Sequence, residues 1–111
     1  MMQRLITFLG GPIFDGKRLR QGYAAQFRAG QLAKMVPLTE LGERGDMIDL
    51  GGDILSPGYV DLQVNGGGGV MLGDAPNVET IATICDAHRS LGATTILPTL
   101  ITDTAEKTRA T

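Results

Sequence analysis

The sequence predicts an α/β fold, with short strands in its first half and a strand–helix–strand unit in its second half. Residues 1–56 carry short apolar runs separated by Gly, Pro and Asp, and they show no stripe at helical spacing. Residues 57–111 contain an alternating run, an amphipathic helical stretch and a second run rich in β-branched residues. That order of elements forms a parallel strand pair with a right-handed crossover. We therefore expect two parts, a small antiparallel β-segment over 1–56 and a β/α part over 57–111.

Turn chemistry places the strands of the first part. Asp15-Gly16 is a tight-turn dipeptide that follows a short apolar run, and Arg28-Ala29-Gly30 separates two runs that should pair as a hairpin. Residues 38–45 are polar and contain Gly, which indicates a loop or a single helical turn. The strands expected from these boundaries cover residues 5–9, 13–14, 23–27, 31–36 and 47–50.

The second part begins with the most regular pattern in the chain, residues 59–65. Its apolar and polar side chains alternate strictly, as on a β-strand with two different faces. Four glycines, 66–69, follow directly, and glycine permits positive φ and the close approach of a ligand. Polar side chains that end at such a backbone are one way to build a site at the end of a strand. The apolar set is Val60, Leu62 and Val64, and the polar set is Asp61, Gln63 and Asn65.

A helix is expected after a loop of about ten residues. Asn77 suits its N-cap position, and apolar side chains recur at helical spacing until Gly92, which suits the position just past the end. Residues 93–97 then form the second strand. Asp103 with Glu106 resembles a capping pair for a second helix, which about two turns later reaches the last residue.

Residues 54–69, ILSPGYVDLQVNGGGG, resemble the first barrel strand of the amidohydrolase superfamily. Most members carry Asp-x-His-x-His there, and the two histidines bind metal. Gln63 and Asn65 replace both histidines, and this Gln-x-Asn form before a Gly-rich loop is similar to the N-acetylglucosamine-6-phosphate deacetylase branch. Residues 92–102 resemble the second strand of the same branch. The resemblance covers residues 47–111 well and the first 46 loosely.

The resemblance implies a larger protein than this chain. It implies the amino-terminal part of a (β/α)8 TIM-type barrel, incomplete here, after a small antiparallel β-domain segment. The implied activity is hydrolysis of N-acetylglucosamine 6-phosphate to glucosamine 6-phosphate and acetate, with a divalent metal, zinc, that polarises the amide and activates water. The family's metal ligands and its general-base aspartate have no counterpart within residues 1–111. We therefore expect no catalytic and no metal-binding residue here, no activity from the isolated chain, and a homo-oligomer at full length.

Gln63 and Asn65 are the candidate substrate-binding residues. An amide both donates and accepts hydrogen bonds, so it can hold a water or a substrate acetamide, but it is a poor metal ligand beside imidazole. The alternative is an antiparallel strand with one hydrated face, which produces the same alternation. Asp61 lies deeper on that face and should hydrogen-bond backbone rather than act in catalysis.

The remaining polar and reactive residues favour structural roles. The glycine run lacks both G-x-G-x-x-G and a following Gly-Lys-Ser/Thr, which argues against a nucleotide site. His88, the single histidine, should pack or meet the helix dipole rather than bind metal. Cys85 should be a small buried hydrophobe. Thr99, at a strand end, could line the site.

Composition excludes several classes of protein. The chain has 111 residues, 42% apolar and 20% charged, and a formal charge of −2, which predicts neither a nucleic-acid nor a membrane partner. A single cysteine precludes an internal disulfide, and the sequence shows no signal peptide, so a cytoplasmic location is expected. Two other functions remain open at this point: another amidohydrolase, such as a deaminase or cyclic amidase, and a non-catalytic interaction segment.

Overall fold

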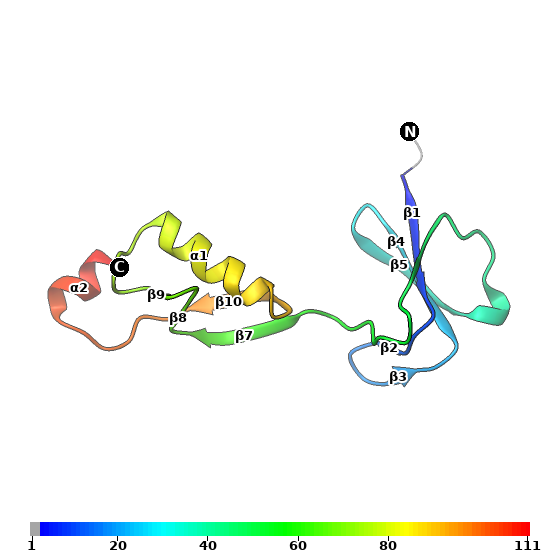
Figure 1. Cartoon of the computed structure of the whole chain (residues 1–111), viewed down its shortest axis with the longest axis horizontal. Helices are drawn as coiled ribbons and strands as arrows, with labels where there is room; N and C mark the ends of the chain where they lie inside the picture. The colour runs from blue at the N-terminus through cyan, green and yellow to red at the C-terminus, as the bar shows by residue number, and fades with distance from the viewer. Residues whose placement is uncertain (1–2) are drawn as a thin grey trace. The chain divides into compact units, whose positions relative to one another are not determined.

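The structure is a computed structural model that describes residues 3–111. The chain divides into two compact units, Met1–Pro57 and Gly58–Thr111, which are described separately (Figure 1). Within the described residues, no helix is long and apolar enough to cross a membrane.

A four-stranded sheet in the order β5-β4-β1-β6 forms the first unit. Strand β4 pairs antiparallel with both β1 and β5, and a two-residue turn joins β4 to β5. Ala29 and Gly30 in that turn have φ of 49° and 74°, the left-handed pair typical of a type I′ hairpin, which confirms the predicted hairpin. The strands are β1 (Leu5–Leu9), β4 (Tyr23–Arg28), β5 (Gln31–Pro37) and β6 (Asp46–Asp49), and a 3-10 turn, η1 (Leu38–Glu40), follows β5.

A short antiparallel pair, β2 (Ile13–Phe14) and β3 (Leu19–Arg20), completes this unit, and the turn that joins the two strands begins at Asp15. The Asp15 carboxylate accepts hydrogen bonds from the backbone N–H of Arg18 (2.7 Å) and of Lys17 (2.8 Å), and it pairs with Arg20 at 2.8 Å. The Arg18 N–H, then the Arg20 guanidinium and the Lys17 N–H, lower the pKa of Asp15 to about 2. The predicted Asp-Gly turn is thus held by the aspartate itself.

The expectation of a purely antiparallel sheet is wrong at β6. Strand β6 runs parallel to β1, with Ile6 opposite Asp46 and Leu9 opposite Asp49. Strands β1 and β5 both run antiparallel to β4, and β6 runs parallel to β1. Strands β5 and β6, at the two edges of the sheet, therefore run in the same direction. Residues 38–45 therefore carry the chain back across the sheet instead of turning it as a hairpin.

Two buried polar side chains hold this crossing segment. Thr7 and Gln26 face each other on β1 and β4, and both are at most 1% exposed. The Gln26 amide donates to the Thr7 hydroxyl (2.9 Å) and to the Glu43 carbonyl (2.6 Å), and the Thr7 hydroxyl donates to the Arg44 carbonyl. The carbonyls of Glu43 and Arg44 are thus paired with side chains and are not left unsatisfied over the sheet.

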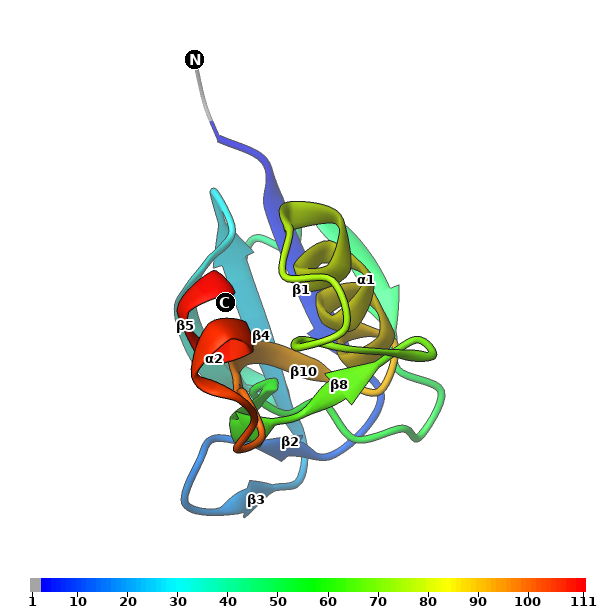
Figure 2. The same ribbon diagram turned by 90° about the vertical axis from the view of Figure 1, so that its left-hand side faces the viewer.

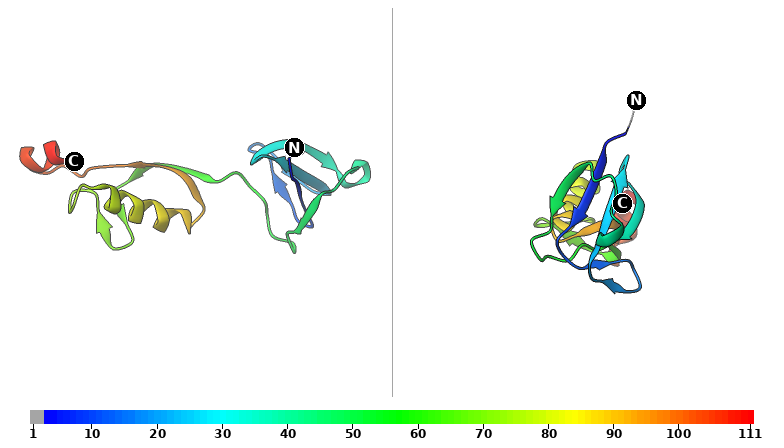
Figure 3. Two further views of the ribbon diagram at one scale, coloured as in Figure 1. Left: turned by 90° about the horizontal axis from the view of Figure 1, so that it is seen from above. Right: turned by 90° about the vertical axis from the view of Figure 1, so that its right-hand side faces the viewer.

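The second unit contains the predicted strand–helix–strand arrangement. Strands β7 (Tyr59–Val64) and β10 (Ala93–Pro98) pair in parallel, and helix α1 (Val78–Arg89) connects them, which confirms the predicted parallel pair. The helix lies along one face of the two strands (Figures 1 and 3). Asn77 is the N-cap as predicted, and its side chain accepts from the Thr80 N–H at 2.8 Å. The chain ends in helix α2 (Ala105–Ala110).

Only one of the three apolar side chains of β7 is covered by the helix. Val64 is 2% exposed and packs with Leu72 and Ile84, whereas Val60 and Leu62 are 61% and 71% exposed. The predicted strand is present, but burial along it does not alternate, and within this chain Val64 is the only member of its apolar set that is buried.

The cap of α2 differs from the prediction. Thr104, not Asp103, is the N-cap, and its hydroxyl accepts from the Lys107 N–H at 3.3 Å. Asp103 pairs instead with the Lys107 ammonium, also at 3.3 Å. The Asp-x-x-Glu spacing is compatible with a capping box, but the helix starts one residue later, where a threonine supplies the oxygen.

Candidate functional site

A hollow of about 170 Å³ lies where β7 and β10 end. Every lining residue follows one of the two strands, and in parallel β/α proteins this carboxyl end is where sites are built. Its lining consists of Asn65, Met71, Gly73, Asp74, Leu100, Ile101, Thr102 and Asp103. This hollow is the candidate site in the second unit.

The two predicted substrate-binding residues differ in their relation to the hollow. Asn65 lines it, whereas Gln63 is exposed on the strand face opposite Val64 and is not part of the lining. Asp61, which shares that face, accepts from the Gln63 backbone N–H at 3.2 Å, the structural role expected for it. Thr99, at the end of β10, donates its backbone N–H to the Val64 carbonyl at 2.8 Å, so it links the two strand ends without lining the hollow.

Two carboxylates in the hollow were missed by the sequence analysis as site residues. Asp74 accepts from the Met71 N–H at 3.1 Å, and Asp103 accepts from the Thr104 N–H at 2.7 Å. The Thr104 N–H, with the Lys107 ammonium beside it, holds the pKa of Asp103 below its usual value. The sequence pattern predicts only a helix cap at Asp103, and it predicts a loop around Asp74. Proximity of both to Asn65 depends on strand pairing and not on spacing in the sequence.

The loop expected after residue 65 is in fact a small hairpin, β8 (Gly66–Gly67) and β9 (Val70–Met71). Gly68 and Gly69 have φ of 62° and 83°, which favours glycine at both turn positions. A Cβ at Gly66 would lie 2.5 Å from the Val70 carbonyl oxygen, too close for any side chain. Turn geometry and the protein's own packing thus explain the glycines, with no bound phosphate required.

The hairpin packs on helix α1, as Figure 2 shows for β8. A Cβ at Gly67 would lie 3.0 Å from His88 Nε2, and one at Gly68 would lie 2.8 Å from Thr83 Cγ2. His88 Nε2 also lies 2.9 Å from the Gly66 carbonyl oxygen. His88 is therefore engaged in packing and hydrogen bonding, and Cys85, which was expected to be buried, is half-buried.

The side chains that the structure describes do not form a site for a divalent metal. Among residues 3–111, no three His, Cys, Asp or Glu side chains come together in a group that could hold an ion. Asn65, Asp74 and Asp103 line one hollow, but only the two aspartates are among these ligand types. No chemical step through a metal can be derived from these residues.

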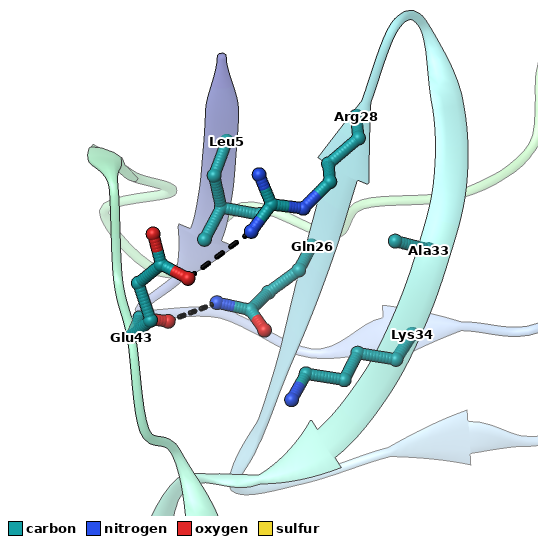
Figure 4. A pocket seen from close by; sticks show the side chains of 6 residues that line it. All are labelled: Leu5, Gln26, Arg28, Ala33, Lys34 and Glu43. Atoms are coloured by element: carbon teal, nitrogen blue, oxygen red, sulfur yellow. Dashed lines mark hydrogen bonds and ion pairs between the residues drawn. The ribbon is translucent and has the colours of Figure 1, made fainter. Parts of the chain in front are cut away.

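A second cavity, of about 230 Å³, lies in the first unit and serves the fold (Figure 4). Arg28 and Gln26 both reach Glu43 across it, Arg28 through an ion pair of 3.1 Å and Gln26 through the backbone carbonyl. Lys34 extends from β5 toward the same space. Since the Glu43 carboxylate neutralises Arg28, the cavity offers a ligand little beyond one exposed ammonium, and its polar groups hold the crossing segment.

Structural likeness to a solved protein indicates the fold. A solved structure described as an amidohydrolase superposes with a TM-score of 0.58 at 22% identity, over 83% of this chain and 24% of its own length, which shows a shared fold. No family model matches the chain.

More specific likeness is to the sugar-phosphate deacetylases. N-acetylglucosamine-6-phosphate deacetylase from Pasteurella multocida superposes with a TM-score of 0.85 at 30% identity, over 95% of this chain and 28% of its own length. N-acetylgalactosamine-6-phosphate deacetylase from a Shewanella species is 48% identical over 56 residues, half of this chain. N-acetylglucosamine-6-phosphate deacetylase from Haemophilus influenzae is 43% identical over 68 residues, 61% of this chain. The resemblance recognised in the sequence is confirmed.

The similarity covers a small part of each relative. The matched segments are 14% and 18% of the lengths of the Shewanella and Haemophilus proteins. The activity of a whole enzyme therefore comes to this chain only as a proposal.

Proposed function

We propose that this chain is the amino-terminal part of a metal-dependent deacetylase that hydrolyses N-acetylglucosamine 6-phosphate to glucosamine 6-phosphate and acetate. One observation carries the proposal: the fold of nearly the whole chain superposes on such a deacetylase with a TM-score of 0.85, and curated deacetylases are 43–48% identical to parts of it. Strand–helix–strand unit β7–α1–β10 would then be the start of a (β/α)8 barrel.

The epimeric sugar is a second candidate substrate. The relative that is 48% identical is named for N-acetylgalactosamine 6-phosphate, which differs from the gluco sugar only at C4. Both substrates carry the same acetamide and phosphate, so the proposed chemistry is the same for both.

Asn65 and Gln63 would act on substrate or water through their amides. Asn65 supports this role because it lines the hollow at the end of β7. Asp74 and Asp103 beside it are carboxylates, which repel a phosphate group and favour donors such as an amide N–H or a sugar hydroxyl. We therefore assign the acetamide end of the substrate to this hollow and the phosphate to another part of the enzyme.

The proposal places the remaining machinery outside residues 1–111. A divalent metal, zinc, would be held by side chains of the longer protein, because residues 3–111 do not assemble a donor set. Activity of the isolated chain is accordingly not expected. A homo-oligomeric enzyme in the cytoplasm, as predicted from the sequence and its resemblance, belongs to the same proposal.

A chimeric enzyme tests the proposal directly. The segment of the Haemophilus influenzae relative that matches this chain is replaced by the corresponding residues of this chain, and acetate release is measured with both epimers. We expect activity on one or both sugars, and the ratio of the two kcat/KM values identifies the substrate. A folded, metal-loaded chimera without acetate release from either sugar would refute the proposed function. The matched control is the relative carrying its own segment, assayed in the same way.

A further inference from the structure

We propose that His88 is a positioning residue for Asn65, acting through the backbone of Gly66; its consequence for catalysis rests on the proposed function. His88 lies in the last turn of α1 and is 22 residues from Gly66 in sequence, yet its Nε2 is 2.9 Å from the Gly66 carbonyl oxygen. A carbonyl oxygen only accepts hydrogen bonds, so Nε2 carries the proton. Neutral His88 is thereby assigned to the Nε2–H tautomer.

Asn65 is held from both sides by long-range hydrogen bonds. The carbonyl of Val64, the residue before it, accepts from the Thr99 N–H at 2.8 Å. The carbonyl of Gly66, the residue after it, accepts from His88. Glycine has more backbone freedom than any other residue, so without the His88 bond the chain leaving β7 would have only one of these two restraints. The two bonds together restrain the backbone on both sides of Asn65, which lines the hollow.

The His88 contact is built into packed structure. A side chain at Gly67 would meet both His88 Nε2 at 3.0 Å and Ala87 Cβ at 3.4 Å, and one at Gly68 would meet Thr83. The hairpin backbone thus lies directly on the helix surface, and glycine permits the approach that the hydrogen bond requires. A histidine side chain exposed to solvent would not require glycines opposite it.

Three substitutions separate the hydrogen bond from the bulk of the ring. His88→Gln keeps a donor near the position of Nε2, His88→Asn places its amide near the position of Nδ1, and His88→Ala removes both. Arg89→Ala, in the same helical turn but exposed, is the matched control. The chain contains one histidine, so ¹⁵N-histidine labelling yields the tautomer of His88 without ambiguity.

Two measurements on the chain itself test the hydrogen bond. The ¹⁵N spectrum of the neutral ring should show the Nε2–H form, and a predominant Nδ1–H form would overturn the proposal. Amide exchange over residues 65–71 should accelerate roughly twofold to tenfold in His88→Ala and His88→Asn, the effect of one hydrogen bond. It should stay near the wild-type rate in His88→Gln and Arg89→Ala, while exchange over residues 93–98 is unchanged in all four variants. Equal effects of Gln, Asn and Ala, or no protection of 65–71 in the wild-type chain, would contradict it.

The catalytic consequence is measured in the chimera. His88→Ala and His88→Asn should lower kcat several-fold at constant metal content, and His88→Gln should restore it. Unchanged kcat in all three variants would overturn the positioning role even if the tautomer and exchange results agree with the hydrogen bond. An inactive wild-type chimera would count against the proposed function alone, because the tautomer and exchange measurements do not depend on activity.

Discussion

Replacing Gln26 with Leu should destabilise the first unit, because its amide holds the segment that crosses the sheet. Gln26 is 1% exposed and donates two hydrogen bonds, to the Thr7 hydroxyl at 2.9 Å and to the Glu43 carbonyl at 2.6 Å. Leu has nearly the same volume, so the substitution removes the hydrogen bonds without opening a large cavity.

The magnitude follows from the two lost bonds. Each intramolecular hydrogen bond contributes a net ~0.5–1.5 kcal/mol, so their loss lowers the free energy of unfolding by about 1–3 kcal/mol. The Glu43 carbonyl would also be left near the sheet without its partner, which places the expected value in the upper half of that range. Strand β6 follows this segment directly, so its parallel pairing with β1 should loosen first.

Urea unfolding followed by far-ultraviolet circular dichroism measures the effect, with Gln31→Leu as the matched control. Gln31 belongs to the same hairpin but is exposed, so its replacement should change stability by no more than about 0.5 kcal/mol. Equal shifts of the midpoint for the two variants, or a stabilising effect of Gln26→Leu, would show that the amide does not anchor the crossing segment.

Three further predictions concern the site, the core and pH. In the chimera, Gln63→Ala and Asn65→Ala should each lower kcat/KM at unchanged metal content, by about 10²–10³-fold if the lost hydrogen bond is made to the transition state. Loss of metal in Gln63→Ala would contradict the proposal that this amide acts on substrate or water. Val64→Ala should lower the free energy of unfolding by roughly 1–3 kcal/mol, whereas Leu62→Ala should lower it by about 0.5 kcal/mol or less, because Leu62 is 71% exposed on the same strand. Equal losses for the two variants in urea unfolding would show that α1 does not cover Val64. Hydrogen bonds within the turn lower the pKa of Asp15 from 3.8 to about 2, so the stability that its carboxylate contributes is complete above about pH 4 and is lost as the pH falls toward 2. The Asp15→Asn variant should not show this pH dependence in its unfolding curves. If the variant does show it, other titrating groups are responsible.

The local elements of this protein follow from short-range rules in its sequence. The alternating run over residues 59–65 identifies a strand, and Asn77 identifies the start of the helix by the chemistry of its cap. The helix ends at Arg89 with Ser90 as its C-cap, earlier than the position predicted from Gly92. The Ala29-Gly30 turn joins β4 and β5 as a hairpin. In each case the decisive interactions join residues within a few positions of one another, so the pattern is visible along the chain.

Only part of the candidate site could be predicted from the sequence, because some of its residues meet through long-range contacts. Asn65 could be identified because it ends an alternating strand, but Asp74 and Asp103 belong to it only through the pairing of β7 with β10. The glycines after Asn65 indicated a special backbone. Packing against α1, and not a ligand, turned out to account for Gly67.

Contacts between distant residues were decided by the tertiary structure. The direction of β6 depends on carbonyls near residue 43 that meet Thr7 and Gln26, and no local turn rule specifies a crossing of that kind. His88 reaches Gly66 across 22 residues of sequence for a similar reason. Periodicity and capping determine which segments become strands and helices. The packing of these elements then decides which buried side-chain donor pairs with which backbone carbonyl, because a polar group that packing buries must find a hydrogen-bond partner nearby.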